Sequence, residues 1–577
     1  MRKLSLALVA ALALLSCSRG PKDGEYTLTV LSTNDVHGSW FDSTYVGKGI
    51  KRSLFAVNTY IDSVRRADGA DHVLLIEAGD CLQGDNAAYY FNYVDTLSPH
   101  LFPRLIDYMG YDAVVWGNHD VETGHKVYDR VNRELKHYGV PFLAGNAIRD
   151  DNGKTYFPLY KIVRKAGLKI AVLGYENANI KAWLAEEVWS GMHFDSILSR
   201  VQQDVDAVRA KERPDVVVLA LHSATGNGDG TNPEAEGLDV FNHVKGVDWV
   251  LCSHDHRPYV EVRDSAVLMN AGSHCRFLGH GKMRLSVKDG RIVAKTFEAD
   301  LIPVKAEKAD PQMRGHFRKD FEAVRAFTVQ EVGVLRKDLR TRESFTGPCD
   351  YMNLIHGLCL EASGAQLSIA APLTYNGFIP AGTLVFNDLF TIYPFENQLY
   401  VISMTGEEVQ EYLEASYDRW IQTWTAPGDH VLKLVPKDNT RTGEVGWSFA
   451  NASFNFDSVA GINYTVDVTK PRGSRINIGS MADAAPFDPS ATYSVALTSY
   501  RASGGGNLLQ EIGIDPDRID ERVQARFPEI RNILYAQLQK DGSIDTHPAR
   551  LGSWRFIPEK VAVPALQADM ALLFKTK

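Results

Sequence analysis

The feature that most constrains the fold of this chain is a series of five short polar fragments, each directly after a short apolar run. In chain order they are Asp35-Val36-His37, Gly79-Asp80, Gly117-Asn118-His119-Asp120, Leu221-His222 and Ser253-His254-Asp255-His256. The apolar runs before them, at 27–32, 73–78, 113–116, 216–220 and 249–252, have the length and composition of β-strands. One such fragment would carry little information, but five in order favour a fold in which five strand ends meet at one rim.

The residue types in these fragments are those that bind a pair of divalent metal ions. Asp35 and His37 are two residues apart, so on an extended strand both side chains would point to one face and could bind one ion, whereas His256, two residues after His254, can turn toward the other ion. Asp80 offers two carboxylate oxygens and is predicted to bridge the ions. Oxygen and nitrogen ligands without thiolate favour Zn, Mn, Fe or Co over a structural zinc site. Each histidine alone is better read as a surface or core residue, and only the complete set reverses that reading. The predicted ligands are Asp35, His37, Asp80, Asn118, His222, His254 and His256.

The first 17 residues are expected to lie outside the fold. Met1-Arg2-Lys3 is a basic start, and residues 4–15 form a largely apolar run that is too short to span a bilayer as a helix. The run ends in Leu14-Leu15-Ser16-Cys17, which resembles a bacterial lipoprotein signal, where the cysteine becomes the lipidated N-terminus. An ordinary signal peptide with an incidental cysteine is the alternative. We expect an exported bacterial lipoprotein that faces the periplasm or lies at the outer membrane or cell surface.

Composition places the remainder among ordinary globular proteins, with 45% hydrophobic and 23% charged residues in a chain of 577. The net charge of −9 argues against nucleic acid polymers as partners, since these need a basic surface, but it allows small phosphorylated substrates. The cysteines after Cys17 are odd in number and sparse, which is not the pattern of a disulfide framework. Cys81 and Cys252 adjoin the predicted ligands but lack CxxC spacing, so they are expected to be small buried residues rather than ligands.

The chain is predicted to contain two domains. From 26 to about 305, strand-like runs alternate with helical patterns such as 54–65, 101–109 and 197–211, which indicates an α/β domain. A charged stretch at 306–330, with Pro311 near its start, is expected to form a linker helix. Residues 331–556 carry further helices, at 350–363 and 406–416, and further strands, at 398–404 and 493–498. The tail at 557–577 has no clear anchor in the sequence, and its end at 570–574 is expected either to dock as a helix or to fray.

The ordered fragments resemble the calcineurin-like metallophosphoesterase superfamily. The second half narrows the resemblance, because Tyr-Pro-Phe-Glu-Asn-Gln-Leu-Tyr at 393–400 and Met-Thr-Gly at 404–406 resemble the C-terminal domain of the 5′-nucleotidase family. Segments 461–467, 473–476 and 500–506 are most similar to the 2′,3′-cyclic-nucleotide 2′-phosphodiesterase/3′-nucleotidase branch. The fold implied is a layered α-β-β-α metallophosphoesterase domain, joined by a helix to a separate mixed α/β C-terminal substrate domain.

The resemblance implies a role for each matching residue. The first ion would be held by Asp35, His37, Asp80 and His256, and the second by Asp80, Asn118, His222 and His254. His119 would be the catalytic histidine beside the phosphoryl group. In the family an acid three residues after this histidine orients it, which here is Glu122, while Asp120 takes the place of the first acid in the motif. Both stay candidate partners of His119, with Glu122 preferred. The two ions would activate a water, and a protonated His119 would stabilise developing charge or protonate the leaving group.

Recognition of the nucleotide is assigned to the second domain. Tyr500, beside the triple glycine at 504–506, matches the base-stacking position of the family, with packing of the ring on the turn as the alternative. The opposing ring could be Tyr393, Phe395 or Phe456, and core packing is the alternative for each of them. Further candidate polar contacts are Asn397 and Arg501.

Two differences from the 5′-nucleotidase sequence pattern argue against specificity for 5′-nucleotides. The 5′-nucleotidase and UDP-sugar hydrolase branch typically has a Gly-Gly-Gly-Ile-Arg segment and a later Gly-Gly-Asp-Gly, whereas residues 371–377 here contain no arginine and 503–506 no aspartate. We therefore expect a monomeric two-metal phosphoesterase that converts 2′,3′-cyclic nucleotides and 3′-nucleotides to nucleoside and phosphate. The alternatives are a 5′-nucleotidase or UDP-sugar hydrolase, and a non-catalytic surface-binding protein that would be expected to have lost ligands.

Overall fold

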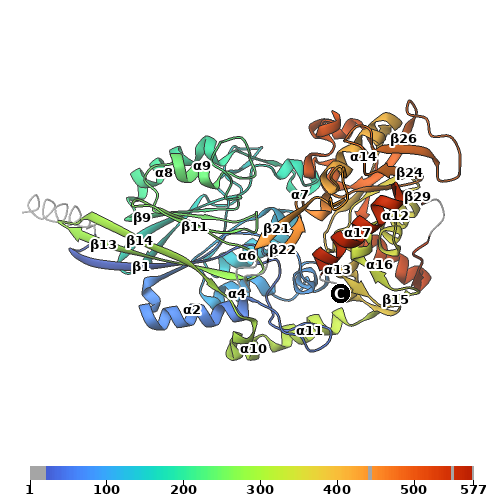
Figure 1. The fold of residues 1–577 in the computed structure, drawn as a ribbon. Coiled ribbons are helices and arrows are strands. Elements are labelled where there is room, and N and C mark those ends of the chain that lie inside the picture. Colours follow the sequence, from blue (N-terminus) through green and yellow to red (C-terminus); the bar gives the residue numbers. More distant parts are fainter. Residues whose placement is uncertain (1–20, 439–444, 548–550, 575–577) are drawn as a thin grey trace, which may run out of the picture. The chain divides into compact units, whose positions relative to one another are not determined.

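The structure is a computed structural model that describes residues 21–438, 445–547 and 551–574. Cys17 and the expected signal segment lie outside the described residues. The chain divides into two compact units, each with its own sheets and core (Figure 1). Unit 1 consists of Met1–Ile180 and Glu187–Glu322, and unit 2 of Lys181–Glu186 and Ala323–Lys577. No helix in the described part of the chain is both long enough and apolar enough to cross a membrane.

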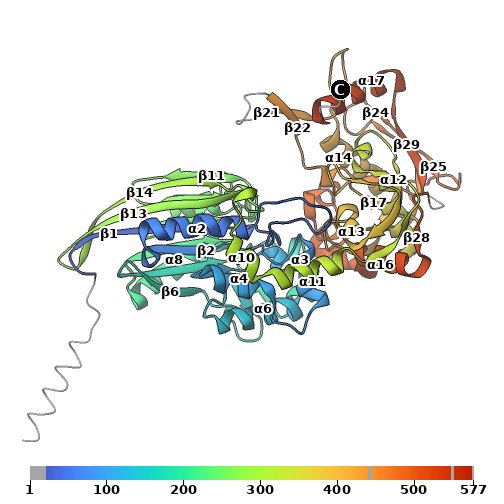
Figure 2. The ribbon, with the colours of Figure 1, turned by 90° about the horizontal axis from the view of Figure 1, so that it is seen from below.

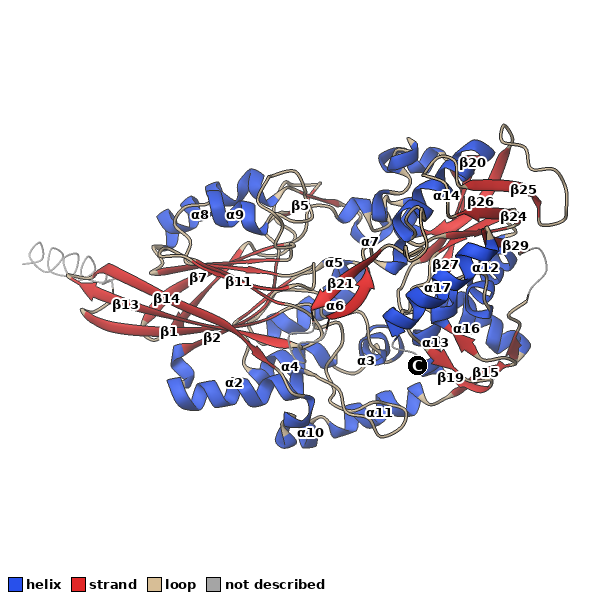
Figure 3. Ribbon diagram, viewed as in Figure 1, coloured by secondary structure: helices blue, strands red, loops and turns tan. Residues whose placement is uncertain are grey.

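Unit 1 is built on two six-stranded sheets, each with parallel strands at its centre. The first sheet runs β14 (Arg291–Pro303), β13 (Phe277–Lys288), β1 (Gly24–Thr33), β2 (Val73–Glu77), β3 (Ala113–Val115) and β4 (Phe142–Leu143). The second runs β11 (Pro258–Val262), β12 (Val267–Ala271), β10 (Trp249–Cys252), β9 (Val216–Leu221), β7 (Leu168–Tyr175) and β6 (Tyr160–Lys165). Strands β1 to β4 are mutually parallel, as are β7, β9, β10 and β12. Figure 3 shows the long antiparallel hairpin β13–β14 at the edge of the first sheet.

Helices cover the outer faces of the two sheets and complete the layers. The helices of unit 1 include α2 (Leu54–Asp68), α4 (Leu101–Met109), α6 (His125–His137), α8 (Ile197–Glu212) and α9 (Gly237–His243). Figures 1 and 2 show α2 against the first sheet, and Figure 1 shows α8 and α9 along the second. Alternate residues of β7 face different cores: Ile170 and Val172 pack between the sheets, whereas Ala171 packs with α8 and α9. The predicted layered α-β-β-α arrangement is confirmed.

The linker predicted at 306–330 is not one helix. It contains α10 (Pro311–His316) and α11 (Arg318–Thr328), which are separated at Phe317, a buried residue whose φ/ψ of −97°/16° are not helical. Asp310 caps α10 through its side chain, which accepts the N–H of Gln312. Pro311 occupies the first turn of α10, as expected for a residue without an N–H. The division between the compact units falls within α11, after Glu322.

Unit 2 is a mixed α/β body. Its main sheet runs β23 (Ser458–Ala460), β17 (Leu367–Ala370), β26 (Thr492–Thr498), β20 (Gln398–Thr405) and β27 (Val523–Glu529). Two smaller sheets run β25 (Ile476–Met481), β24 (Ile462–Asp467), β29 (Gly552–Ile557), and β19 (Gly382–Val385), β15 (Glu331–Leu335), β28 (Ser543–Ile544). Its longer helices are α12 (Asp350–Ser363), α14 (Gly406–Trp420), α16 (Ile530–Asp541) and α17 (Glu559–Phe574), and its short ones include α13 (Phe386–Ile392) and α15 (Ser499–Ala502). A hairpin is formed by β21 (Leu434–Asp438) and β22 (Val445–Phe449).

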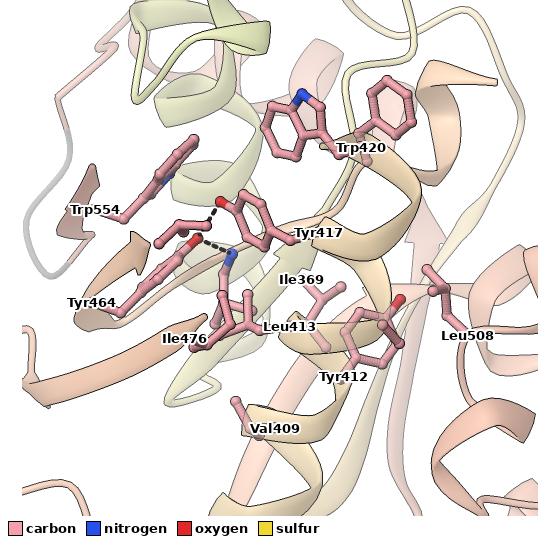
Figure 4. Close-up of a cluster of buried hydrophobic side chains, with 14 of the residues drawn as sticks. Ile369, Val409, Tyr412, Leu413, Tyr417, Trp420, Tyr464, Ile476, Leu508 and Trp554 are labelled. Atoms are coloured by element: carbon pink, nitrogen blue, oxygen red, sulfur yellow. Dashed lines mark hydrogen bonds between the residues drawn. The ribbon is translucent and has the colours of Figure 1, made fainter. Parts of the chain in front are cut away.

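An aromatic core packs around α14 in unit 2. Tyr417 stacks on Trp420 with ring centroids 4.9 Å apart, and its hydroxyl lies 3.0 Å from that of Tyr464, so that two buried polar groups satisfy each other (Figure 4). The chain's tail adds to this core, because α17 contributes the buried Ala562 and Leu566. Of the two expectations for residues 557–577, the docked helix is therefore the one that the structure contains.

Candidate metal centre

The register of the parallel strands aligns the polar fragments at one edge of each sheet of unit 1. In the first sheet Thr33 pairs with Glu77, and Glu77 with Val114, so the segments beginning at Asn34, Ala78 and Trp116 leave the sheet together. In the second sheet the ends of β9, β10 and β12 are aligned in the same way. The loop after β1 is then tied to the loop after β2 by backbone hydrogen bonds from Asp35 to Gly79 and from His37 to Asp80, each 2.9 Å long.

The first cluster of possible metal ligands is formed by Asp35, His37 and His256, whose ligand atoms all lie within 4.8 Å of one another. The Nε2 atoms of His37 and His256 are 2.9 Å apart, and Nε2 of His256 is 3.6 Å from Oδ1 of Asp35. Two imidazole nitrogens and a carboxylate that converge in this way form the arrangement that one divalent cation binds.

The second cluster is formed by Asp80, His222 and His254. Nε2 of His222 is 3.2 Å from Oδ2 of Asp80 and 2.9 Å from the amide oxygen of Asn118, which is also 3.0 Å from Nδ1 of His254. Oδ2 of Asp80 lies 3.9 Å from Nε2 of His37 in the first cluster as well. Asp80 is therefore placed between the two clusters, where a bridging carboxylate would be needed.

The donor set fits two divalent ions by its chemistry. It consists of carboxylate, amide and imidazole groups, and neither metal-capable cluster in the described residues includes a cysteine. Burial raises the pKa of Asp35 to about 7 and lowers the pKa of His254 to about 3 and that of His256 to about 4. Desolvation thus makes charged forms of these groups expensive in isolation, and bound cations would offset the cost for the carboxylates while using the imidazoles in their neutral form.

The backbone at the ligands adopts the left-handed region, which non-glycine residues seldom enter. Positive φ values occur at Asp35 (48°), His37 (46°), Asp80 (62°), His254 (69°) and His256 (58°). Strain of this kind is typical of functional sites, because the surrounding structure must maintain it. The predicted reason for the spacing of Asp35 and His37 is wrong, because both residues follow the end of β1 and do not lie on an extended strand. His254 and His256 follow the end of β10 and reach different clusters, in line with the expectation that His256 turns toward the other ion.

Two glycines lie so close to the ligands that any side chain at these positions would clash with them. A Cβ atom at Gly117 would lie 2.3 Å from both N and Oδ1 of Asp80, and one at Gly79 would lie 2.5 Å from Nδ1 of His222. Both distances are far below van der Waals contact. Glycine at these positions therefore permits the close approach of the second, third and fourth fragments.

Hydrogen bonds to non-ligand groups orient the ligands. Nδ1 of His222 lies 2.9 Å from the carbonyl oxygen of Ala78, which directs Nε2 toward Asp80. Asn34 donates to Oδ2 of Asp35 at 2.6 Å and to the carbonyl of Gly272 at 2.6 Å. Asn34 was not among the residues predicted from the sequence, although its place directly before the first fragment was an available signal. His274, whose ring stacks on that of His37 with centroids 5.1 Å apart, was not predicted either.

The structure pairs Glu122, rather than Asp120, with the candidate catalytic histidine. Oε2 of Glu122 is 2.6 Å from Nδ1 of His119, and Asp80 and Glu122 raise the pKa of His119 to about 9 although burial alone would lower it. The carboxylate of Asp120 instead accepts backbone N–H groups. These donors are Asp80, Cys81, Leu82 and Gly117, at 2.8–3.1 Å. The candidate catalytic role of Asp120 is therefore corrected to a structural one, which fixes the loop that carries Asp80.

The two cysteines beside the ligands are buried, as expected. Cys81 and Cys252 have at most 1% of their surface exposed, and burial raises the pKa of both thiols. A Cβ atom at Gly237 would lie 2.5 Å from Sγ of Cys252, so this sulfur fills space against α9. Both side chains act as packing groups under the rim.

In unit 2 some of the candidate base-binding residues are exposed and others are buried. Tyr500 lies in α15, directly after β26, and is partly exposed. The ring of Phe454, which is 39% exposed, lies edge-to-face with the ring of Tyr500, with the two centroids 6.4 Å apart. Phe456, the predicted alternative, is fully buried and stacks on Trp420 at 5.5 Å, so it belongs to the core. The sequence reasoning missed Phe454, although it stands two residues from Phe456.

The remaining candidate substrate-binding residues also differ in their exposure. Arg501 is 3% exposed and forms an ion pair of 2.8 Å with Asp457, so its guanidinium holds the fold together rather than facing a ligand. Tyr393 is also a core residue, with 1% exposure. Phe395 and Asn397 are partly exposed and precede β20, whose first residue, Gln398, donates its N–H to Ser499. They therefore lie at the end of the sheet that carries Tyr500.

Comparisons with known proteins agree with this division. Residues 28–258 match the family model of the calcineurin-like phosphoesterases, and residues 327–511 match that of the 5′-nucleotidase C-terminal domain. The chain is 23% identical, over 96% of its length, to a 2′,3′-cyclic-nucleotide 2′-phosphodiesterase/3′-nucleotidase of Haemophilus influenzae, of which it covers 91%. It is 22% identical, over 95% of its length, to the trifunctional nucleotide phosphoesterase protein YfkN of Bacillus subtilis, but spans only 40% of that longer protein.

Solved structures show the same fold. A 5′-nucleotidase precursor from Thermus thermophilus matches with a TM-score of 0.60 at 19% identity, and the match covers 92% of this chain and 100% of that one. At this level of identity the likeness concerns the arrangement of the elements.

Proposed function

Because the chain joins a calcineurin-like phosphoesterase domain to a 5′-nucleotidase C-terminal domain, and is therefore a metal-dependent phosphoester hydrolase, we propose that it hydrolyses 2′,3′-cyclic nucleotides and 3′-nucleotides to nucleoside and phosphate. The observation that carries the reaction class is the pair of ligand clusters with Asp80 between them. The substrate class is supported by the relative from Haemophilus influenzae, which this chain matches along almost its whole length.

The residues of the site have separable tasks in this proposal. Asp35, His37 and His256 would hold the first divalent ion and His222, His254 and Asn118 the second, with Asp80 available to both. Two such ions would supply an activated water and neutralise charge on the phosphoryl group. His119 holds a proton on its ring, oriented by Glu122 through Nδ1, so that Nε2–H is available to the phosphoryl oxygens or to the leaving sugar oxygen. The strained loops preset these positions before substrate arrives.

The base is held in unit 2 by Tyr500 and Phe454 in this proposal. Their rings are perpendicular, at 85°, without ligand, and stacking of a base on an aromatic ring is worth about 1–3 kcal/mol. Tyr500→Ala is therefore expected to raise KM for nucleotides by about 5- to 150-fold, with a much smaller change for the base-free substrate p-nitrophenyl phosphate. Phe378→Ala is the matched control, since Phe378 is 51% exposed and stacks under Arg340 instead.

A substrate panel tests the proposal and its main alternative. Protein that begins at residue 18, supplied with Mn or Zn, is expected to release phosphate from 3′-AMP and to open 2′,3′-cyclic AMP. Activity confined to 5′-AMP or UDP-sugars would support the 5′-nucleotidase or UDP-sugar hydrolase alternative and refute the preferred substrates. A preparation that retains activity after Asp80→Ala would contradict the metal site itself. A protein inactive on every phosphoester, although loaded with metal, would support the non-catalytic alternative.

The cellular location proposed is that of an exported lipoprotein anchored through Cys17. This rests on the sequence of residues 1–17, namely a basic start, a short apolar run and a cysteine after Ser16. Incorporation of a labelled fatty acid into the wild-type chain, and its loss in Cys17→Ser, is the expected result. Equal labelling of both chains would contradict the anchor.

A further inference from the structure

Unit 2 contains a cavity that the proposed reaction does not use. It has a volume of about 480 Å³ and lies between the 3₁₀ helix η5 (Thr341–Phe345) and the C-terminal helix α17. This volume is within the range of sites that bind small organic molecules. The lining residues are Arg342, Glu343, Thr346, Val563, Leu566, Gln567, Met570 and Phe574. Five of these eight residues belong to α17, which lies outside the part of the chain matched by the 5′-nucleotidase family model.

One side of the cavity carries a cation that lacks a partner. Arg342 is half-buried, yet within the described residues its guanidinium forms neither a hydrogen bond nor an ion pair nor a cation–π contact. Two other arginines of unit 2 have partners: Arg340 pairs with Asp338 and stacks on Phe378, and the buried Arg501 pairs with Asp457. A partly desolvated guanidinium with five donors and no acceptor is a site for an anion, preferably one with two oxygens.

The opposite side of the cavity is apolar. Val563, Leu566, Met570 and Phe574 are spaced by three or four residues and so share one face of α17. Leu566 is buried in the core, Met570 and Phe574 are half-buried, and Val563 is 47% exposed. The ring of Phe574 is held 4.9 Å from that of Tyr375, which gives this wall an aromatic end.

From this juxtaposition we propose that the cavity binds a small organic anion, with one carboxylate, sulfonate or phosphate group at Arg342 and an apolar body along α17. The cationic edge and the apolar wall together suit a molecule that has both parts, with the anionic group at Arg342 and directed away from Glu343, whose exposed side chain also lines the cavity. All of the lining residues belong to unit 2, whereas the metal ligands belong to unit 1. The site is therefore distinct from the metal centre.

Titration of the purified, metal-loaded protein with 8-anilinonaphthalene-1-sulfonate tests the proposal, because this fluorescent probe combines a sulfonate with an aromatic body. Saturable binding of one equivalent is expected, with displacement by 4-phenylbutyrate and at least about tenfold weaker displacement by the neutral 4-phenylbutanol. Arg342→Gln is expected to weaken binding of the probe by at least about tenfold. Val563→Glu, which adds a negative charge at an exposed lining position, is expected to have a similar effect.

Matched substitutions outside the cavity serve as controls. Arg340→Gln removes a neighbouring arginine that already has partners, and Leu572→Glu adds a charge to α17 at a residue that does not line the cavity. Both are expected to bind the probe within twofold of the wild type. Binding that does not saturate, that is unchanged in Arg342→Gln, or that is displaced equally well by phenylbutanol overturns the proposal. Thermal melting of each variant distinguishes loss of the site from loss of the fold.

Discussion

Replacing Glu122 by glutamine tests the mechanism at the contact that the sequence left open. The two side chains are partly enclosed, with 26% of His119 and 10% of Glu122 exposed, and the Nδ1–Oε2 distance is 2.6 Å. Glutamine keeps the size of the side chain but removes its negative charge. The backbone N–H of His119, which donates to Asp80, is unaffected. The substitution therefore alters the orientation and charge of the imidazole and leaves the metal ligands in place.

The expected effect follows from the strength of that contact. A hydrogen bond with a charged partner contributes about 1.5–3 kcal/mol, and each 1.36 kcal/mol corresponds to a tenfold change in rate. If the contact acts fully in the transition state, kcat falls by about 10- to 150-fold. KM is expected to change less than kcat, because Tyr500 and Phe454, which hold the base in this proposal, do not depend on this pair. The assay is steady-state hydrolysis of 3′-AMP, with metal content measured in the same samples.

Asp120→Asn is the matched control for this experiment. Asp120 accepts four backbone N–H groups, so an amide in its place is expected to lower thermal stability and metal retention while kcat per metal-loaded molecule stays within about threefold. The reasoning is refuted if Glu122→Gln keeps kcat within twofold of wild type, or if Asp120→Asn, with full metal content, is the variant that loses it.

Three further predictions concern buried groups. Burial raises the pKa of Glu77 from 4.5 to about 8. In the metal-free protein, the free energy of unfolding of the wild type relative to Glu77→Gln is therefore expected to fall by roughly 5 kcal/mol as pH rises from about 4.5 to about 8. A difference between the two proteins that stays constant over this range, measured by urea denaturation, would contradict this prediction. Gly117→Ala places a Cβ atom 2.3 Å from Asp80 and is expected to reduce metal affinity or activity by about 10- to 100-fold, measured by metal analysis and kinetics. Full metal occupancy and full activity would show that the loop can move to accommodate the methyl group. Arg501→Met removes the ion-pair partner of Asp457 in the core and is expected to lower the free energy of unfolding by about 3–5 kcal/mol, measured by urea denaturation, and an unchanged stability would contradict this structural role of Arg501.

The metal site was predictable because it depends on strand order and residue type. Parallel strands end at a common edge, and the five fragments each follow such an end, so their convergence could be inferred without coordinates. The local geometry could not. Asp35 and His37 lie in left-handed turns rather than on a strand, and sequence spacing does not distinguish these cases when the residue is not glycine.

The substrate residues of unit 2 were less predictable, because exposure there depends on distant partners. Phe454 lies within the short 3₁₀ helix Ser453–Asn455 and Phe456 directly follows it, and Phe456 is the ring that packs into the core on Trp420 of α14. From the sequence, Arg501 is likewise a candidate for substrate binding, but in the structure it forms an ion pair with Asp457, which belongs to a separate segment. Such pairings join residues far apart in the chain, and they leave no local pattern to read.

The position of the last strand and helix sets an order of events during biosynthesis. β29 pairs in parallel with β24, and Asp569 in α17 accepts the N–H groups of Val431 and Leu432. The fold of unit 2 therefore cannot be completed before residues near 570 have been synthesised. The two large sheets of unit 1, in contrast, need no residue beyond Pro303. Since a chain emerges from its N-terminus, unit 1 is able to fold while the interior of unit 2 is still open to water. The interval between the two closures is the period in which this chain depends most on protection from aggregation.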